Sequence, residues 1–230
     1  MKTIGLIGGT TWVSTKEYYR IINEEINKKL GEKHSAKCIL YSIDFEEVVV
    51  KNYDDWEKIT NSFKDIAKTL ENAGAECIVI CANTMHKIAD KVEENINIPL
   101  IHIADATGEK IKEKNLKKVG LLGTKYTMNE EFIKQRIKDK YDIETIVPND
   151  DDQKIIEDII NNELTFEIIK ESSKQKYIDI INKLVSKGAE GIILGCTEIP
   201  LLIKSSDVNI PVFDTTSIHA KAAVEYALRK

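Results

Sequence analysis

The sequence predicts an α/β fold of two similar lobes that arose by internal duplication, each a mostly parallel sheet flanked by helices. Three segments of the chain recur in the same order. Residues 74–84 (GAECIVICANT) return 114 residues later as 188–198 (GAEGIILGCTE), while 5–10 (GLIGGT) and 97–101 (NIPLI) return as 120–124 (GLLGT) and 209–213 (NIPVF). Short apolar runs also alternate with longer segments of helical period, which is typical of βαβ units and parallel sheets.

Each predicted strand is a short apolar run bounded by glycine or polar residues, and each predicted helix repeats its apolar residues every three to four positions. In the first lobe we expect strand 2–7, helix 14–30, strand 36–42, helix 55–73, strand 76–81, helix 84–95 and strand 99–103. In the second we expect helix 105–114, strand 117–122, helix 128–140, strand 143–147, helices 151–162 and 165–187, strand 190–195, helix 198–204 and strand 211–213, before a closing helix 215–229. The first lobe therefore comprises 1–104 with 215–230, and the second comprises 105–214.

Composition is that of an ordinary soluble protein. Hydrophobic residues make up 42% and charged residues 31% of the 230, with only four prolines. The net charge of −5 argues against nucleic acid as a partner. No window reaches the roughly 20 uninterrupted apolar residues that a membrane span needs, and the chain enters its first strand without a signal peptide. We therefore expect a cytoplasmic protein with no membrane partner.

The cysteines are interpreted as reduced thiols without a metal. Cys38, Cys77, Cys81 and Cys196 show no zinc-type spacing, and no two histidines show ligand spacing within one element. Side chains alternate along a strand, so Cys77 and Cys81 share one face and Ala82 takes the opposite one. Cys81 is therefore predicted to point into the packing of the sheet. The repeat aligns Ala82, rather than Cys81, with Cys196.

Ligands of such sheets bind beyond the carboxyl ends of the strands. Each repeated segment ends at such a place with small polar residues. The predicted active site is a cleft between the lobes, ringed by Gly8-Gly9-Thr10-Thr11, Ala82-Asn83-Thr84, Gly123-Thr124 with Thr127, and Cys196-Thr197-Glu198. The glycine pair lacks the G-x-G-x-x-G spacing of a dinucleotide site and instead indicates a tight turn that turns backbone N–H groups and the hydroxyls of Thr10 and Thr11 toward a small anion.

Polar residues after the strands have two interpretations. Asn83 and Thr84 can bind a carboxylate at a helix N-terminus or cap the helix, and the same pair of roles applies to Thr124 and Thr127. His86 either faces the cleft or serves as a polar cap. His102 and His219 are predicted to be structural, and His34 to lie at the surface.

Cys196 is the candidate catalytic base. At a strand-to-helix turn, the helix dipole and nearby N–H groups would stabilise a thiolate, while the alternative is a buried small hydrophobe. Its neighbours favour the first interpretation. Thr197 offers a donor, and Glu198 could hold or relay a proton, a role for which His86 is the second candidate.

At these motifs the chain resembles the aspartate/glutamate racemase family over essentially its whole length, and its broad-specificity amino-acid branch most closely. The matching segments are Met1–Tyr19, Ala82–Lys87, Gly195–Glu198 and Pro211–His219. The resemblance implies a homodimer that interconverts L- and D-amino acids without pyridoxal phosphate or any other cofactor, using one cysteine on each face of the α-carbon. It assigns Cys196 to the second cysteine, and Asn83, Thr84, Thr124 and Thr127 to binding of the substrate carboxylate.

Ala82 occupies the place of the first family cysteine. Three explanations stay open: an alanine introduced to trap a substrate complex, a natural one-cysteine branch that uses water or Thr84 on the empty face, and replacement by Cys81. A one-cysteine decarboxylase or isomerase of small dicarboxylates is the alternative enzyme, and a silent amino-acid binder is the alternative from another class.

The substrate tail is a second departure from the family pattern. The resemblance places an arginine after the second strand and a lysine ahead of the second cysteine, where this chain has Asp44-Phe45-Glu46-Glu47 and Thr165. Acidic residues would repel an aspartate side chain. We therefore expect a polar, neutral or cationic tail, unless Lys51 or Lys154 reaches the substrate.

Overall fold

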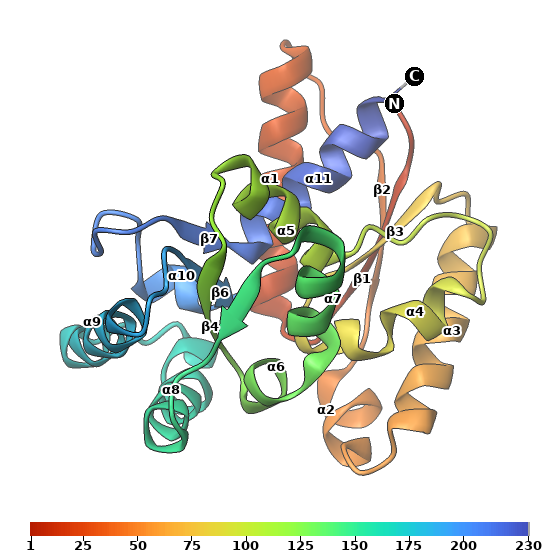
Figure 1. Cartoon of the computed structure of the whole chain (residues 1–230). Coiled ribbons are helices and arrows are strands. Elements are labelled where there is room, and N and C mark those ends of the chain that lie inside the picture. The colour runs from red at the N-terminus through yellow and green to blue at the C-terminus, as the bar shows by residue number, and fades with distance from the viewer. Residues whose placement is uncertain (230) are drawn as a thin grey trace. The chain divides into compact units, whose positions relative to one another are not determined.

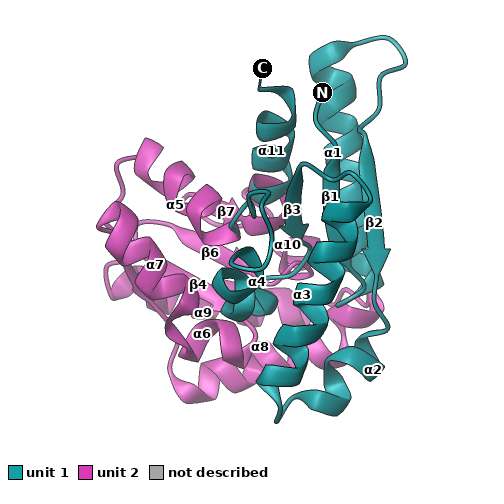
Figure 2. Cartoon of the chain, turned by 90° about the vertical axis from the view of Figure 1, so that its right-hand side faces the viewer, with its two compact units in different colours: residues 1–102, 219–230 teal, residues 103–218 magenta. Residues whose placement is uncertain are grey.

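The computed structural model describes residues 1–229, which divide into two compact units. Unit 1 is Met1–His102 together with the chain from His219 onward, and unit 2 is Ile103–Ile218 (Figure 2). The predicted boundaries at 104/105 and 214/215 lie two and four residues from these. Within the described chain, no helix is long and apolar enough to cross a membrane.

Unit 1 is built on a three-stranded parallel sheet in the order β2 (Cys38–Ser42), β1 (Ile4–Gly8), β3 (Cys77–Ile80). Leu100 adds a single parallel bridge to Ile78 beyond β3. The helical elements are α1 (Trp12–Leu30), α2 (Phe45–Val48), η1 (Val50–Asn52), α3 (Trp56–Asn72), η2 (Thr84–Ile88) and α4 (Ala89–Glu93) (Figure 1).

Strands β1 and β3 are buried on both faces, as expected for parallel strands, whereas the edge strand β2 is partly exposed. Ile78 and Ile80 of β3 pack with Phe63 and Leu70 of α3. Cys77, Val79 and Cys81 take the other face, against side chains of α1 and of the C-terminal helix α11 (Thr215–Leu228). Each fully buried aliphatic or aromatic side chain contributes about 1.5–3 kcal/mol to stability, so these two layers hold the strand ends in fixed positions.

Unit 2 has a four-stranded parallel sheet in the order β5 (Glu144–Ile146), β4 (Lys118–Gly123), β6 (Ile192–Gly195), β7 (Val212–Asp214). Its helical elements are α5 (Ile103–Glu113), α6 (Lys125–Asn129), α7 (Glu131–Tyr141), α8 (Asp150–Asn162), η3 (Leu164–Phe166), α9 (Glu171–Ser186), α10 (Ile199–Leu202) and the start of α11. Helices α8 and α9 supply apolar side chains to one face of the sheet, and α5 and α7 supply them to the other.

Equivalent residues of the two repeats pair in the same way within the two sheets, as expected for a duplicated unit. Gly5 pairs with Ile78 in unit 1, and Gly120 pairs with Ile192 in unit 2. The next pairs, Ile78 with Leu100 and Ile192 with Val212, also correspond. The predicted fold class, two α/β lobes with parallel sheets, is therefore confirmed. Counting on from the paired positions, Ala82 is the counterpart of Cys196.

Several predicted elements differ locally from the structure. Strand 99–103 is reduced to the bridge at Leu100, because α5 already begins at Ile103. Predicted helix 84–95 is a 3₁₀ turn followed by one short α-helical turn. Extended backbone at Glu130 divides predicted helix 128–140 into α6 and α7. Extended backbone at Lys170 delays the predicted helix 165–187 until α9, and the short helices α2 and η1 were not predicted.

Candidate active site

The loop after β1 is held tightly against the end of β2. Gly9 has φ +90°, and a Cβ there would overlap the Ile43 carbonyl, so only glycine fits. The Gly9 N–H donates to Thr15 Oγ1 at 2.8 Å. Thr11 is the N-cap of α1 and accepts from the Ser14 N–H at 3.1 Å. Thr10 is buried, and its hydroxyl has no hydrogen-bond partner in the part of the chain that is described, which leaves it available to a ligand.

The loop after β3 carries Ala82, Asn83 and Thr84. Ala82 packs at the margin of the apolar layer that contains Ile80, on the face opposite Cys81, as predicted from strand alternation. Asn83 is buried and precedes η2 without a side-chain capping bond to that turn. Thr84 begins the turn and is partly exposed. The capping interpretation therefore does not account for the Asn83 side chain.

Cys77 and Cys81 are core residues. Both are fully buried in the layer shared with α1 and α11. Burial raises the pKa of Cys77 to about 12 and raises the pKa of Cys81 as well. Neither thiol is poised to ionise, and the prediction that Cys81 points into the sheet packing is confirmed.

Three of the four histidines form a buried cluster in unit 1. His86 places its ring 4.7 Å from that of His102 and 5.3 Å from that of His219, centroid to centroid. His86 Nδ1 lies 2.7 Å from the Ala82 carbonyl oxygen, which can only accept a hydrogen bond. No group of histidine, cysteine or acidic side chains in residues 1–229 is arranged as a metal site.

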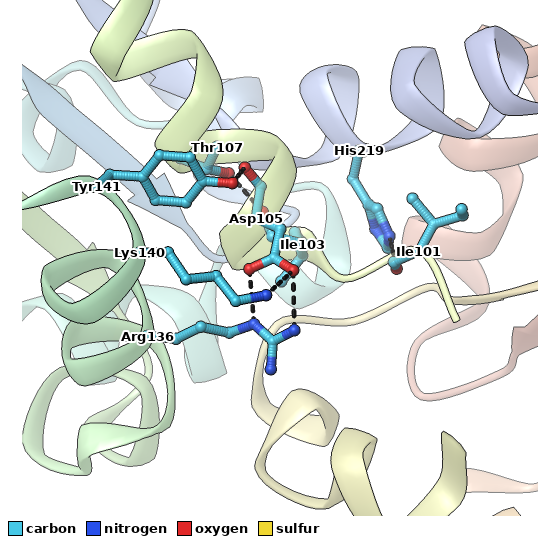
Figure 3. A network of polar contacts seen from close by, with 8 residues as sticks. All are labelled: Ile101, Ile103, Asp105, Thr107, Arg136, Lys140, Tyr141 and His219. Atoms are coloured by element: carbon cyan, nitrogen blue, oxygen red, sulfur yellow. Dashed lines mark hydrogen bonds and ion pairs between the residues drawn. The ribbon is translucent and has the colours of Figure 1, made fainter. Parts of the chain in front are cut away.

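His219 is the most constrained member of this cluster. Its Nε2 donates to the Ile101 carbonyl at 2.6 Å, a pair drawn in Figure 3, and its Nδ1 accepts from the Tyr18 hydroxyl at 2.8 Å. Burial lowers the pKa of His219 to about 4, although the bond to Ile101 opposes this effect. The ring is therefore neutral at physiological pH. Sequence reasoning missed the cluster, because its members come from separate segments with no shared spacing.

In unit 2 the loop after β4 carries the two threonines. Thr124 is the N-cap of α6, and its Oγ1 accepts from the Thr127 N–H at 3.4 Å and lies 3.1 Å from Thr127 Oγ1. Thr127 is fully buried beneath this loop. The predicted capping role of Thr124 is confirmed, and it leaves open the binding role that the family resemblance implies.

The loop after β6 carries Cys196, Thr197 and Glu198. The Cys196 thiol donates to Glu198 Oε2 at 3.0 Å, and the Thr197 hydroxyl donates to the same oxygen at 2.6 Å. Cys196 is 7% and Glu198 3% exposed, so the pair meets little water. The sequence thus brings a thiol, a hydroxyl and a carboxylate together over three consecutive residues.

Cys196 is held as a thiol in this structure, and its action as a thiolate stays a prediction. Burial, and next the charge of Glu198, raise the pKa of the Cys196 thiol well above its ordinary value. The N–H groups of Glu198 and Ile199 act in the opposite direction but are outweighed. Helix α10 has only four residues, so its dipole is weak.

The residues expected near the substrate tail also have roles in local structure. Asp44 is the N-cap of α2 and accepts from the Glu47 N–H at 3.1 Å, at the β2 edge that adjoins Gly9. Glu46 and Glu47 occupy the first turn of that helix, where negative charge is favourable. Thr165 donates to the Ile160 carbonyl at 2.7 Å.

Two α/β units whose strands pair in the same order, with a thiol–carboxylate pair at the end of one β-strand and alanine at the equivalent end of the other, define a duplicated α/β protein with a candidate acid–base group. The family model described as Asp/Glu/Hydantoin racemase matches residues 7–223. The chain therefore belongs to the Asp/Glu/hydantoin racemase family, and the predicted resemblance is confirmed.

Solved structures agree with this assignment. A candidate Asp/Glu racemase from Yersinia pestis is 49% identical, with both chains fully covered and a TM-score of 0.94. An aspartate racemase homologue from Pyrococcus horikoshii is 42% identical, again with full coverage of both chains and a TM-score of 0.88. Glutamate racemase from Francisella tularensis shares the fold alone, at 18% identity and a TM-score of 0.69 over 98% of this chain and 80% of that one.

A curated relative points to the same enzyme class. The broad-specificity amino-acid racemase of Bacillus subtilis is 22% identical over 74% of this chain and 73% of its own length. Family membership and these relatives support an isomerase of the racemase type.

Proposed function

We propose that this protein is a cofactor-independent amino-acid racemase in which Cys196 is the acid–base group for one face of the substrate α-carbon. The observation that carries the proposal is the Cys196–Glu198 pair, 3.0 Å apart and buried at the end of β6. A thiol that donates to a carboxylate has a defined route for its proton. Its counterpart in unit 1, Ala82, has no such group.

The proposed step begins with transfer of the thiol proton from Cys196 to Glu198. The resulting thiolate, in a dry environment, is a stronger base than in water and takes the α-proton of the substrate. The electron pair of the C–H bond moves into the substrate carboxylate and forms an enediolate. Hydrogen-bond donors then stabilise the developing charge, and we assign this role to Thr10, Asn83, Thr84, Thr124, Thr127 and Thr197.

The opposite face of the α-carbon needs a second proton source. The Ala82 methyl group cannot exchange protons, so we assign this step to water or to the Thr84 hydroxyl. Loss of one positioned acid–base group typically lowers a rate by about 10²–10⁴-fold. We therefore expect exchange at one antipode to be much faster than full racemisation.

We propose a substrate with a polar, neutral or cationic tail. Asp44 and the acidic first turn of α2 lie on the sheet edge beside the Gly9 loop, where they disfavour a second carboxylate. Homoserine and lysine are the test substrates of choice.

The test is α-proton exchange in D₂O, followed by NMR on L- and D-forms of homoserine, lysine, aspartate and glutamate. We expect one antipode to exchange in the wild type and both to exchange rapidly in Ala82→Cys. Ala73→Cys, on an exposed position, is the matched control and leaves the rates unchanged. Absence of exchange in both the wild type and Ala82→Cys would refute the proposal.

A second candidate is a one-cysteine decarboxylase or isomerase of small dicarboxylates. The same observation favours it, since a single thiol suffices to protonate one face of an enediolate. Product analysis with an arylmalonate and with maleate distinguishes it from a racemase. An amino-acid binder without activity would bind its ligand and exchange no α-proton.

A further inference from the structure

The two peptide carbonyls on either side of Ala82 are both held by buried side chains. The Ser14 hydroxyl donates to the Cys81 carbonyl at 2.7 Å. His86 Nδ1 donates to the Ala82 carbonyl at 2.7 Å. Ser14 and His86 are each 2% exposed, so both bonds form away from water, where hydrogen bonds are strong and their loss is costly.

The His86 ring packs against two other rings. It makes edge-to-face contacts with His102 and His219, and His219 is hydrogen-bonded at both ring nitrogens, to Tyr18 and Ile101. The bond to Ala82 requires that His86 carry a proton on Nδ1, and the bond to Ile101 requires that His219 carry its proton on Nε2. The histidine cluster therefore acts as a rigid support behind one backbone carbonyl.

Ser14 connects the same backbone to the first loop of unit 1. Its N–H is capped by Thr11, and its neighbour Thr15 holds the Gly9 N–H. The loop that carries Thr10 is thereby tied, through Ser14, to the peptide that precedes Ala82.

We propose that Ser14 and His86 are positioning residues that clamp the backbone at residue 82 and so aim the Asn83–Thr84 segment at the substrate. This inference rests on the proposed function and adds to it a pair of residues that act through the backbone. In a trans peptide the C=O and N–H point in opposite directions, so fixing the Cys81 and Ala82 carbonyls also fixes the N–H groups of Ala82 and Asn83. The direction of the Cβ at residue 82 is fixed with them. Displacements of about 1 Å in such groups can cost 10²-fold in rate.

The kinetic test compares His86→Phe, His86→Asn and Ser14→Ala, each in the wild type and in Ala82→Cys. Phenylalanine keeps the ring volume and loses the donor, whereas asparagine places an amide N–H the same number of bonds from Cα as Nδ1. We expect His86→Phe and Ser14→Ala to lower kcat by about 10- to 100-fold with KM changed by less than about threefold. His86→Asn recovers most of kcat. His34→Asn, at an exposed histidine, is the control.

Equal kcat in His86→Phe and the wild type, or equal losses in His86→Phe and His86→Asn, would overturn the proposal. Should His86→Phe fail to fold, Ser14→Ala provides the test, because the proposal again requires a fall in kcat with KM nearly unchanged. A fall in stability without a fall in kcat in the folded variant indicates a structural role alone and also overturns it.

An activity-independent measurement separates this inference from the proposed function. A two-bond ¹H–¹⁵N correlation spectrum at neutral pH should show the His86 proton on Nδ1 and the His219 proton on Nε2. A His86 ring protonated on Nε2 alone contradicts the clamp. If no amino acid exchanges its α-proton, the proposed function fails. The clamp is then decided by whether His86→Phe or Ser14→Ala shifts the backbone amide signals of Ala82, Asn83 and Thr84.

Discussion

Cys196 donates its thiol proton to Glu198 across 3.0 Å, and the two side chains are buried together at the end of β6. Reactive cysteines are usually activated by a neighbouring cation or a long helix, whereas this one faces an anion. The thiol form is therefore the resting state: burial and then the charge of Glu198 raise the pKa of the Cys196 thiol, and Glu198 is the acceptor of its proton. Thr197 donates to the same carboxylate oxygen and holds it in place.

Glu198→Gln should separate the effect of Glu198 on the pKa of Cys196 from its role as the acceptor of the thiol proton. Removing the charge lowers the pKa of the Cys196 thiol, because the carboxylate raises it both by its charge and by its hydrogen bond. The amide cannot take the thiol proton, so we expect α-proton exchange to slow by about 10²–10⁴-fold. The pH dependence of thiol alkylation and the exchange rate in D₂O measure the two effects.

Glu171→Gln, on the exposed first turn of α9, is the control and should change neither quantity. Exchange at the wild-type rate in Glu198→Gln would show that the proton of Cys196 leaves by another route.

The strand register could be predicted from the sequence, because an internal repeat carries its own alignment. The spacing of 114 residues pairs Ala82 with Cys196, and the equivalent strand pairs Gly5–Ile78 and Gly120–Ile192 bear this out. The alternation of side chains along β3 was enough to predict that Cys81 and Ala82 lie on opposite faces of the sheet. These are local and periodic properties, which one sequence records well.

The ionisation state of Cys196 could not be predicted in the same way. It depends on burial and on a carboxylate two residues away, and a strand-to-helix motif does not reveal the balance between them. The histidine cluster depends on three segments, around residues 86, 102 and 219, that meet only through the fold. The 3₁₀ turn η2 follows in part from His86 bonding back to Ala82, a side-chain contact that helical periodicity cannot indicate.

Asp44→Asn should relax the discrimination against acidic substrates. Asparagine is as good an N-cap as aspartate, so the bond to the Glu47 N–H and the stability of α2 are kept while one negative charge is lost. We expect the ratio of exchange rates for aspartate over homoserine to rise by about three- to tenfold, which corresponds to about 0.7–1.4 kcal/mol. Asp55→Asn, the same change at the N-cap of α3, serves as the capping control. An unchanged ratio would mean that Asp44 does not act on the substrate tail.

Asp105→Asn should weaken the packing of α5 on α7. Figure 3 shows the Arg136 and Lys140 side chains both reaching the Asp105 carboxylate, and the bonds are 2.6 and 2.8 Å to Arg136 and 2.7 Å to Lys140. Burial opposes ionisation of Asp105, but these cations outweigh it and lower its pKa. A lowered carboxylate pKa adds stability above the unfolded-state value, and this stability is lost as pH falls. We expect Asp105→Asn to cost about 1–2 kcal/mol at pH 7 and less at pH 3, measured by urea unfolding.

Asp142→Asn is the control for this change, since Asp142 is the exposed C-cap residue of α7 and forms an ion pair with Lys138. Its effect on the free energy of unfolding should be much smaller than that of Asp105→Asn, because solvent screens an exposed ion pair. Equal effects of the two substitutions at pH 7 would contradict a special role for Asp105.

His219 should make the protein sensitive to mild acid. Its folded-state pKa of about 4 lies below the ordinary 6.5, so between these values the unfolded chain binds a proton that the native state excludes. Stability therefore rises with pH across this window and is lost as pH falls from 6.5 toward 4, by about 3 kcal/mol in total. Unfolding by urea at several pH values measures this slope.

In His219→Gln the side chain does not titrate, so the variant is less stable at pH 7 but shows a shallower slope of stability against pH between pH 4 and 6.5. His34→Gln, at an exposed position, keeps the wild-type slope. Parallel curves for His219→Gln and the wild type would show that the acid sensitivity arises elsewhere.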